Sequence, residues 1–153
     1  MTSTITFEPA KSSDFDYFYK LRRQTMEEHY VRVEEHWDHE TELQKHRNYL
    51  NQGTVRLIYN NGIRIGCVSA APHENGLRIS LFCIEPEHQR KGLGEKVLQK
   101  IIEEAVDQRK DIFLDVLVEN PVCALYERLG FERVEGDCPI LVYYKKPCCF
   151  SVC

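Results

Sequence analysis

The sequence lacks any long hydrophobic run and any start that resembles a leader. Its uninterrupted apolar stretches are only a few residues long, far below the about 20 residues needed to span a bilayer. The first residues, Met1 to Thr6, contain no basic region followed by an apolar run, which a secretory signal would have. We therefore expect a cytoplasmic protein with no membrane partner.

An excess of positive charge is also missing. The chain has 20 lysines and arginines against 24 acidic residues, a formal net charge of −4. It thus lacks the broad basic surface that nonspecific nucleic-acid binding requires, and we expect no nucleic-acid partner. The acidic excess is concentrated between Glu27 and Arg47, alongside Tyr30 and Trp37. Carboxylates beside aromatic rings favour a cationic substrate, although a solvated helix face has the same composition.

C-x-x-C pairs of the zinc-knuckle kind are absent, although the cysteines of the tail could still bind metal or be lipidated. The seven cysteines are an odd number with no C-x-x-C pair, whereas a secreted disulfide framework normally has an even count. We expect reduced thiols. Length and composition predict a single domain over residues 1–147, followed by a short cysteine-rich tail at 148–153.

The hydrophobic pattern predicts both strands and helices. Alternation around Ile5 indicates a first strand, and Asn60-Asn61-Gly62 is typical of a hairpin turn between two more. In the first helix, an N-cap at Ser13 precedes residues at helical spacing, namely Phe15, Phe18, Leu21, Arg22 and Met26. The expected helices cover residues 13–30, 37–50 and 94–108 and a short segment from 121; further strands cover 55–59, 63–68, 77–84, 112–118, 131–134 and 140–144.

A glycine-containing loop joins the strand at 77–84 to the helix at 94–108. Its sequence is Gln89-Arg-Lys-Gly92-Leu-Gly94. Glycines let the backbone approach a ligand closely, and the amides at a helix start favour phosphate. The dinucleotide-binding pattern is excluded because Val97 stands where its third glycine would be, and the GxxxxGK[ST] phosphate loop is absent. Taken alone, the two glycines fit a phosphate site or a simple turn.

With its flanking segments, this loop resembles the GNAT superfamily of N-acetyltransferases. Gln89-x-x-Gly92-x-Gly94 matches that family's pyrophosphate signature for acetyl-CoA, Q/R-x-x-G-x-G/A. Residues 81–86, Leu-Phe-Cys-Ile-Glu-Pro, resemble its fourth strand, whose backbone pairs with pantetheine. Residues 120–131, ending in Leu-Tyr126-Glu-Arg-Leu-Gly-Phe, resemble its second conserved block. The match extends over about residues 55–145 in the expected order.

The resemblance implies an α+β fold with a mostly antiparallel sheet flanked by helices. The sheet would be splayed where its fourth and fifth strands part, and acetyl-CoA would bind there as a co-substrate. Asn120 stands one residue closer to Tyr126 than the asparagine does in the usual family spacing. Glu119 is therefore the alternative occupant of the position that asparagine usually holds. The implied cofactor-binding residues are Phe82, Cys83, Ile84, Gln89, Arg90, Lys91, Gly92, Leu93, Gly94, Glu95, Asn120 and Tyr126.

The resemblance also implies catalytic roles. Tyr126 would protonate the departing CoA thiolate, although a packing tyrosine on a short helix is the alternative. The attacking amine must lose a proton, and Glu85 and Glu28 are the candidate bases, each of which surface solvation would also explain. Three histidines, at positions 36, 39 and 46, do not complete a set of metal-ligand spacings, so we expect no metal.

The predicted function is therefore an N-acetyltransferase, a monomer or homodimer. It would move the acetyl group of acetyl-CoA to a primary amine of a small molecule or peptide by direct transfer. The alternative is a catalytically silent acyl-CoA-binding sensor or interaction module that retains the loop.

Overall fold

The structure is a computed structural model that describes residues 3–32, 36–74, 76–117, 122–135 and 140–145. The strands are β1 (Ile5–Pro9), β2 (Val55–Asn60), β3 (Ile63–His73), β4 (Gly76–Ile84), β5 (Asp111–Leu117), β6 (Glu132–Glu135) and β7 (Ile140–Lys145). The helices are α1 (Phe15–Arg32), α2 (His39–Asn51), α3 (Leu93–Asp107) and α4 (Val122–Arg128), with short 3₁₀ turns at η1 (Ser12–Asp14) and η2 (Pro86–His88).

All seven described strands form one sheet, in the order β1-β2-β3-β4-β5-β7-β6. Every neighbouring pair is antiparallel except β4 and β5, which are parallel because α3 crosses over between them. The pairing begins at Gly76, where a Cβ atom would lie only 2.1 Å from the carbonyl oxygen of Asp111, so the close approach requires glycine. The predicted α+β fold with a mostly antiparallel sheet is confirmed.

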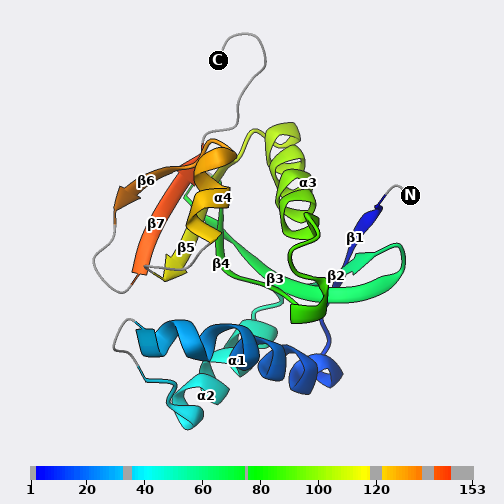
Figure 1. Cartoon of the computed structure of the whole chain (residues 1–153), viewed down its shortest axis with the longest axis vertical. Coiled ribbons are helices and arrows are strands. Elements are labelled where there is room, and N and C mark those ends of the chain that lie inside the picture. The colour runs from blue at the N-terminus through cyan, green and yellow to red at the C-terminus, as the bar shows by residue number, and fades with distance from the viewer. Residues whose placement is uncertain (1–2, 33–35, 75, 118–121, 136–139, 146–153) are drawn as a thin grey trace.

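Helices cover both faces of the sheet (Figure 1). On one face α3 and α4 pack over a core that includes Ile79, Val97, Leu98 and Leu114. On the other face α1 and α2 cover a second core that includes Phe18, Leu57 and Leu81. Successive side chains of a strand point to opposite faces, but the register of β3 and β4 shifts between Ser69 and Ala70, so Ile79 and Leu81 lie on opposite faces although they are two residues apart. We call the two faces the α3 face and the α1 face.

The predicted elements are present in the described residues, with ends shifted by one or two residues, except that the strand predicted at 63–68 runs on to His73 as β3. The hairpin turn after β2 has left-handed backbone at both Asn61 (φ 52°) and Gly62 (φ 81°), as Asn-Gly turns between strands favour. The predicted N-cap at Ser13 is wrong. A 3₁₀ turn precedes α1, and there the Asp14 carboxylate accepts a hydrogen bond from the Lys11 amide at 2.8 Å.

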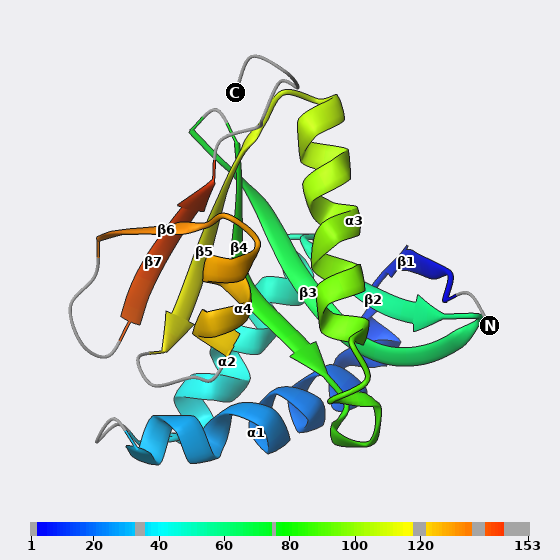
Figure 2. The same ribbon diagram turned by 45° about the horizontal axis from the view of Figure 1, so that its top comes forward.

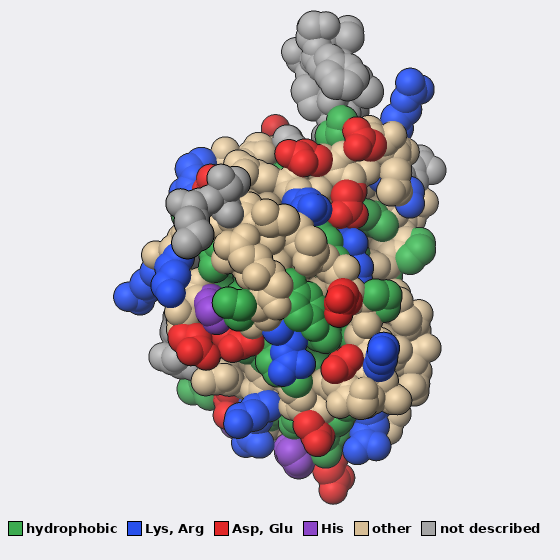
Figure 3. Space-filling model, turned by 90° about the vertical axis from the view of Figure 1, so that its right-hand side faces the viewer, with side chains coloured by type: hydrophobic (Ala, Val, Ile, Leu, Met, Phe, Trp, Pro, Cys, Tyr) green, Lys and Arg blue, Asp and Glu red, His purple; other side chains and the backbone are tan. Residues whose placement is uncertain are grey.

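The charged surface agrees with the composition. Figure 3 shows acidic and basic side chains interspersed around a small apolar area, with no continuous basic region on that side of the molecule. Within the part of the chain that the structure describes, no helix combines the length and the apolar character needed to cross a bilayer.

Candidate active site

The centre of the candidate site is the place where β4 and β5 part. Their register runs from Gly76 opposite Asp111 to Ile79 opposite Leu114 and stops there. Beyond Ile79, β4 continues to Ile84 beside β3, while β5 continues beside β7. Figure 2 shows the two strands diverging. From Ser80 to Ile84, no described strand pairs with the β5-facing edge of β4, so its backbone groups there can bind an extended ligand.

The loop between η2 and α3 lies at the end of this edge. Arg90 (φ 62°) and Gly92 (φ 75°) both have left-handed backbone, and Gly92 caps the N-terminus of α3. A Cβ atom on Gly92 would meet nothing within 4 Å, so the glycine serves the turn and leaves open space above it. The free amides of the first turn of α3 make this end of the helix suited to phosphate.

Side chains fix this loop to the strand edge. The Gln89 amide nitrogen donates a hydrogen bond to the carbonyl of Ile84 at 2.9 Å. Phe82 packs toward the α3 face, with its ring 3.9 Å from the position of a Cβ on Gly94. Glu95, in the first turn of α3, forms an ion pair with Arg128 of α4. The predicted cofactor residues from Phe82 to Glu95 therefore lie together along the unpaired edge of β4 and the loop that leads into α3.

Tyr126 lies on α4, on the α3 face, and is 4% exposed. Its ring packs against Phe131 with centroids 5.9 Å apart. Burial raises the pKa of Tyr126 and the charges of Cys123 and Cys83 add to this, while Arg22 lowers it. Cys83 belongs to the core of the opposite face, so this influence acts across the sheet where β4 and β5 have parted. The hydroxyl stays protonated and able to donate.

Glu85 follows β4 and contacts the α1 face. The Tyr17 hydroxyl of α1 donates a hydrogen bond to Glu85 Oε2 at 2.5 Å, and the guanidinium of Arg64 stacks 3.6 Å from the Tyr17 ring centroid. Burial, followed by this hydrogen bond to Glu85, raises the pKa of Tyr17, so Tyr17 remains the donor. The Glu85 carboxylate is thus held at the end of the strand edge, on the side away from Tyr126.

A cluster of polar groups lies beneath β4 on the same face. Thr25 Oγ1 lies 3.2 Å from Cys83 Sγ, and the charge of the buried Arg22 guanidinium lowers the pKa of this thiol. Cys67 stands directly opposite Cys83 in the register of β3 and β4. Hydrogen bonding from the Cys67 thiol lowers the pKa of Cys83, burial opposes this, and Arg22 and Thr25 lower it further. Cys83 was predicted as a cofactor residue, and its side chain faces α1.

Sequence reasoning missed three functional candidates, Arg22, Tyr17 and the pair of Arg78 with Asp115. Arg78 donates three hydrogen bonds to Asp115, Nε to both carboxylate oxygens (Oδ1 at 3.1 Å and Oδ2 at 2.9 Å) and Nη2 to Oδ1 at 2.6 Å, next to the point where β4 and β5 separate. The sequence does contain a signal for Asp115 and Arg22, because each is a charged residue at a position where the hydrophobic pattern of its strand or helix calls for an apolar one. Asp115 interrupts an apolar strand, and Arg22 occupies the core-facing side of its helix.

Other predicted candidates lie elsewhere or outside the described residues. Asn120 lies outside them, as does the side chain of Glu28. His39 Nδ1 lies 2.9 Å from the Tyr19 hydroxyl, and His46 is fully buried among aromatic rings. Ligand atoms lie within 4.8 Å of one another in a single group of the described residues, Glu85, Glu87 and His88; exposed acidic groups commonly gather so, and the absence of a metal stays a prediction.

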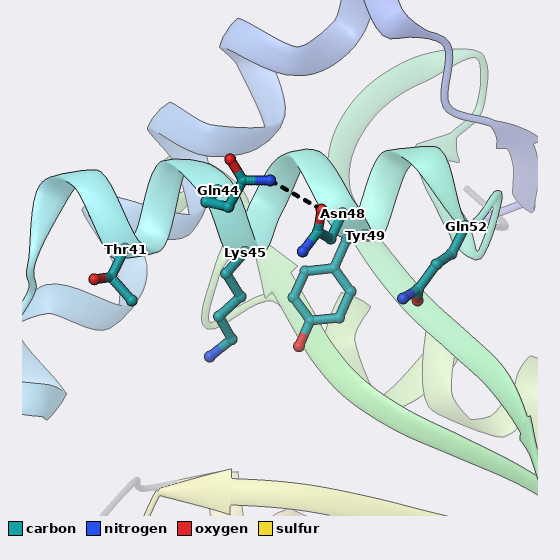
Figure 4. A pocket seen from close by; sticks show the side chains of 6 residues that line it. All are labelled: Thr41, Gln44, Lys45, Asn48, Tyr49 and Gln52. Atoms are coloured by element: carbon teal, nitrogen blue, oxygen red, sulfur yellow. Dashed lines mark hydrogen bonds between the residues drawn. The ribbon is translucent and has the colours of Figure 1, made fainter.

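A shallow surface pocket lies along α2 (Figure 4). Its lining is polar apart from one ring and comes from that helix and the residue that follows it: Thr41, Gln44, Lys45, Asn48, Tyr49 and Gln52. It contributes none of the residues described above and is not part of the candidate active site.

Comparison with known proteins gives one family. The model of the acetyltransferase (GNAT) family matches residues 15–131. The UPF0157 protein YqkA of Bacillus subtilis (strain 168) is 31% identical over 75 residues, which are 49% of this chain and 22% of that protein. The aligned segment thus spans about a fifth of the length of this curated relative.

Solved structures share the fold. The PaiA N-acetyltransferase of Thermoplasma acidophilum, solved with coenzyme A, has a TM-score of 0.72 at 16% identity, covering 94% of this chain and 99% of that one. The ribosomal-protein-S18-alanine N-acetyltransferase of Escherichia coli has a TM-score of 0.70 at 18% identity, covering 94% of each chain. At these identities the likeness concerns the fold.

Proposed function

Because the chain belongs to the acetyltransferase (GNAT) family, we propose that it moves the acetyl group of acetyl-CoA directly to a primary amine of a small molecule or peptide. The family and the fold predicted from the sequence are confirmed, and the N-acetyltransferase activity belongs to the proposal. The acceptor, the direct transfer and the roles of individual residues are our proposal.

One observation carries the proposal, the unpaired edge of β4 that leads to the N-terminus of α3. From Ser80 to Ile84 this edge offers peptide groups to an amide-containing arm, and the loop at 89–94 offers helix-terminal amides to a pyrophosphate. Coenzyme A has both parts in this order, and the Thermoplasma acidophilum relative of the same fold was solved with it.

The chain would hold the cofactor mostly through backbone. Residues Phe82 to Ile84 would pair with the pantetheine arm, and residues Gln89 to Glu95 would surround the pyrophosphate. Acetyl-CoA, when bound, supplies an acetyl group activated as a thioester. Arg90 and Lys91, both exposed on the loop, would add positive charge for the phosphates.

Two side chains would move protons on opposite faces of the sheet. Glu85, held by Tyr17, would accept a proton from the amine on the α1 face, directly or through one water. Tyr126, kept protonated by burial, would donate its proton to the leaving sulfur on the α3 face. The opening between β4 and β5 would let the amine and the thioester meet between them.

The test is acceptor-dependent release of CoA thiol. Purified protein is mixed with acetyl-CoA and a panel of primary amines, and both the free thiol and the acetylated amine are measured. We expect turnover that requires an amine and falls about 10²-fold or more in Glu85→Gln. Glu87→Gln, which removes an exposed carboxylate two residues away, is the matched control. Tight CoA binding without any amine-dependent thiol release would instead identify an acyl-CoA sensor.

A further inference from the structure

Arg22 is a buried cation without a carboxylate partner among the described residues. It is 6% exposed, and its Nε atom is buried with no hydrogen-bond acceptor. None of the ion pairs between described residues involves it. Burial lowers the pKa of Arg22, but the charges of Cys83, Tyr30 and Tyr49 outweigh it and raise the pKa. Burying a guanidinium in this way costs folding free energy unless an anion pairs with it.

Arg78 shows what the same side chain does when it is satisfied. Its Nε and Nη2 atoms bind both oxygens of Asp115 in a fork, the arrangement in which guanidinium and carboxylate fit best. Arg22 is more deeply buried than Arg78, whose side chain is 33% exposed. Its Nε, one arm of that fork, has no acceptor. A single sulfur accepts at one point, so it does not replace a carboxylate.

The unsatisfied Nε atom of Arg22 lies close to the proposed reaction site. Arg22 lies on α1, buried against the sheet, and it interacts electrostatically with Cys83, which stands between Phe82 and Ile84 of the proposed cofactor edge. Its charge also lowers the pKa of Tyr126 on the opposite face. Arg22 therefore lies within electrostatic range of the proposed general acid, on the α1 face where the amine would enter.

We propose that Arg22 binds a carboxylate of the acceptor, so that the substrates are amino acids or other amines that carry a carboxylate near the reacting nitrogen. This inference rests on the proposed function and names its substrate class. The Nε and Nη groups of Arg22 would donate to the two carboxylate oxygens, and the attached amine would be directed toward the opening between β4 and β5. Arg22 is then a specificity-determining residue.

The experiment compares amino acids with their amides and with their decarboxylated amines. In the wild-type protein we expect kcat/KM to be about 10- to 100-fold higher for the carboxylate member of each set, in keeping with a charge-assisted bidentate bond. Arg22→Gln should abolish this preference by raising KM for the amino acids. Arg23→Gln, which removes the same charge from an exposed position one residue along α1, should keep it.

Two results would overturn the inference. One is a failure of the acceptor preference, seen either as the same preference in Arg22→Gln and wild type or as polyamines surpassing amino acids in the wild type. The other is a fall in kcat by the same factor for every acceptor, which would assign Arg22 to the reacting centre.

Binding and stability measurements separate this inference from the proposed function. With CoA present, amino acids should raise the unfolding midpoint of the wild type and of Arg23→Gln but not of Arg22→Gln, whether or not turnover occurs. Arg22→Met should unfold at no lower temperature than the wild type, because an unfilled buried charge gives way to an apolar side chain. A clearly lower midpoint would show that Arg22 is already satisfied within the fold, and would contradict the proposal.

Discussion

The two faces of the sheet build their halves of the candidate site in different ways. On the α3 face the features are mostly backbone, an unpaired strand edge and a left-handed turn before a helix, and they come from one stretch, residues 80–94. On the α1 face they are side chains from distant parts of the chain, such as Thr25 with Cys83 and Tyr17 with Glu85. A backbone site leaves a short contiguous pattern in the sequence, whereas a side-chain site does not.

The largest effect that tests this comparison is expected at Tyr126, the one proposed catalytic side chain of the α3 face. Tyr126→Phe keeps the ring packed against Phe131 and removes only the hydroxyl. Turnover should fall by about 10²- to 10⁴-fold, the usual contribution of a general acid, with CoA affinity little changed. Steady-state kinetics and calorimetric titration measure the two quantities. Wild-type turnover in Tyr126→Phe would make the residue structural.

A smaller effect concerns the stability of the α1 face. His46 is fully buried, its Nδ1 lies 2.6 Å from the carbonyl oxygen of Glu42, and burial lowers its pKa from 6.5 to about 4. The unfolded chain therefore takes up a proton at higher pH than the folded one. The stabilisation is complete above pH 6.5 and is lost as the pH falls through about 4.

The free energy of unfolding should thus drop by about 2 to 3 kcal/mol from pH 7 to pH 4 through this residue alone. Denaturant unfolding measured across this range, for the wild type and for His46→Phe, gives the contribution as a difference. Hydrogen exchange should show α1 and α2 losing protection before α3. Parallel pH dependences in the two proteins would mean that His46 is not the group responsible.

The smallest effect is expected at the loop glycines, where two turns can be compared. Gly92 (φ 75°) and Gly62 (φ 81°) both have left-handed backbone with open space around a Cβ. Replacing either by valine should cost about 1 to 2 kcal/mol of stability through strain. Only Gly92→Val should also weaken CoA, by about tenfold or more, because the strain displaces the amides before α3. An equal CoA affinity in Gly92→Val and Gly62→Val would remove the loop from the site.

The same contrast explains what could be predicted from the sequence. Most elements follow from periodicity, and the cofactor edge follows from the glycine pattern, because each depends on residues close together in the chain. Arg22 was placed among apolar residues at helical spacing, but its burial beside Cys83 depends on how α1 crosses β4. The predicted N-cap at Ser13 is wrong because a local 3₁₀ turn precedes α1, and in it the Asp14 side chain, not that of Ser13, hydrogen-bonds to the backbone.

The central claim, that coenzyme A binds along the unpaired edge of β4 and the α3 N-terminus, is tested most directly by amide hydrogen exchange with and without CoA. We predict added protection within residues 80–84 and 90–96, little change in α1 and α2, and further protection near Arg22 when an amino acid is then added. Protection confined to the α1 face on CoA binding, with none along residues 80–84, would contradict it.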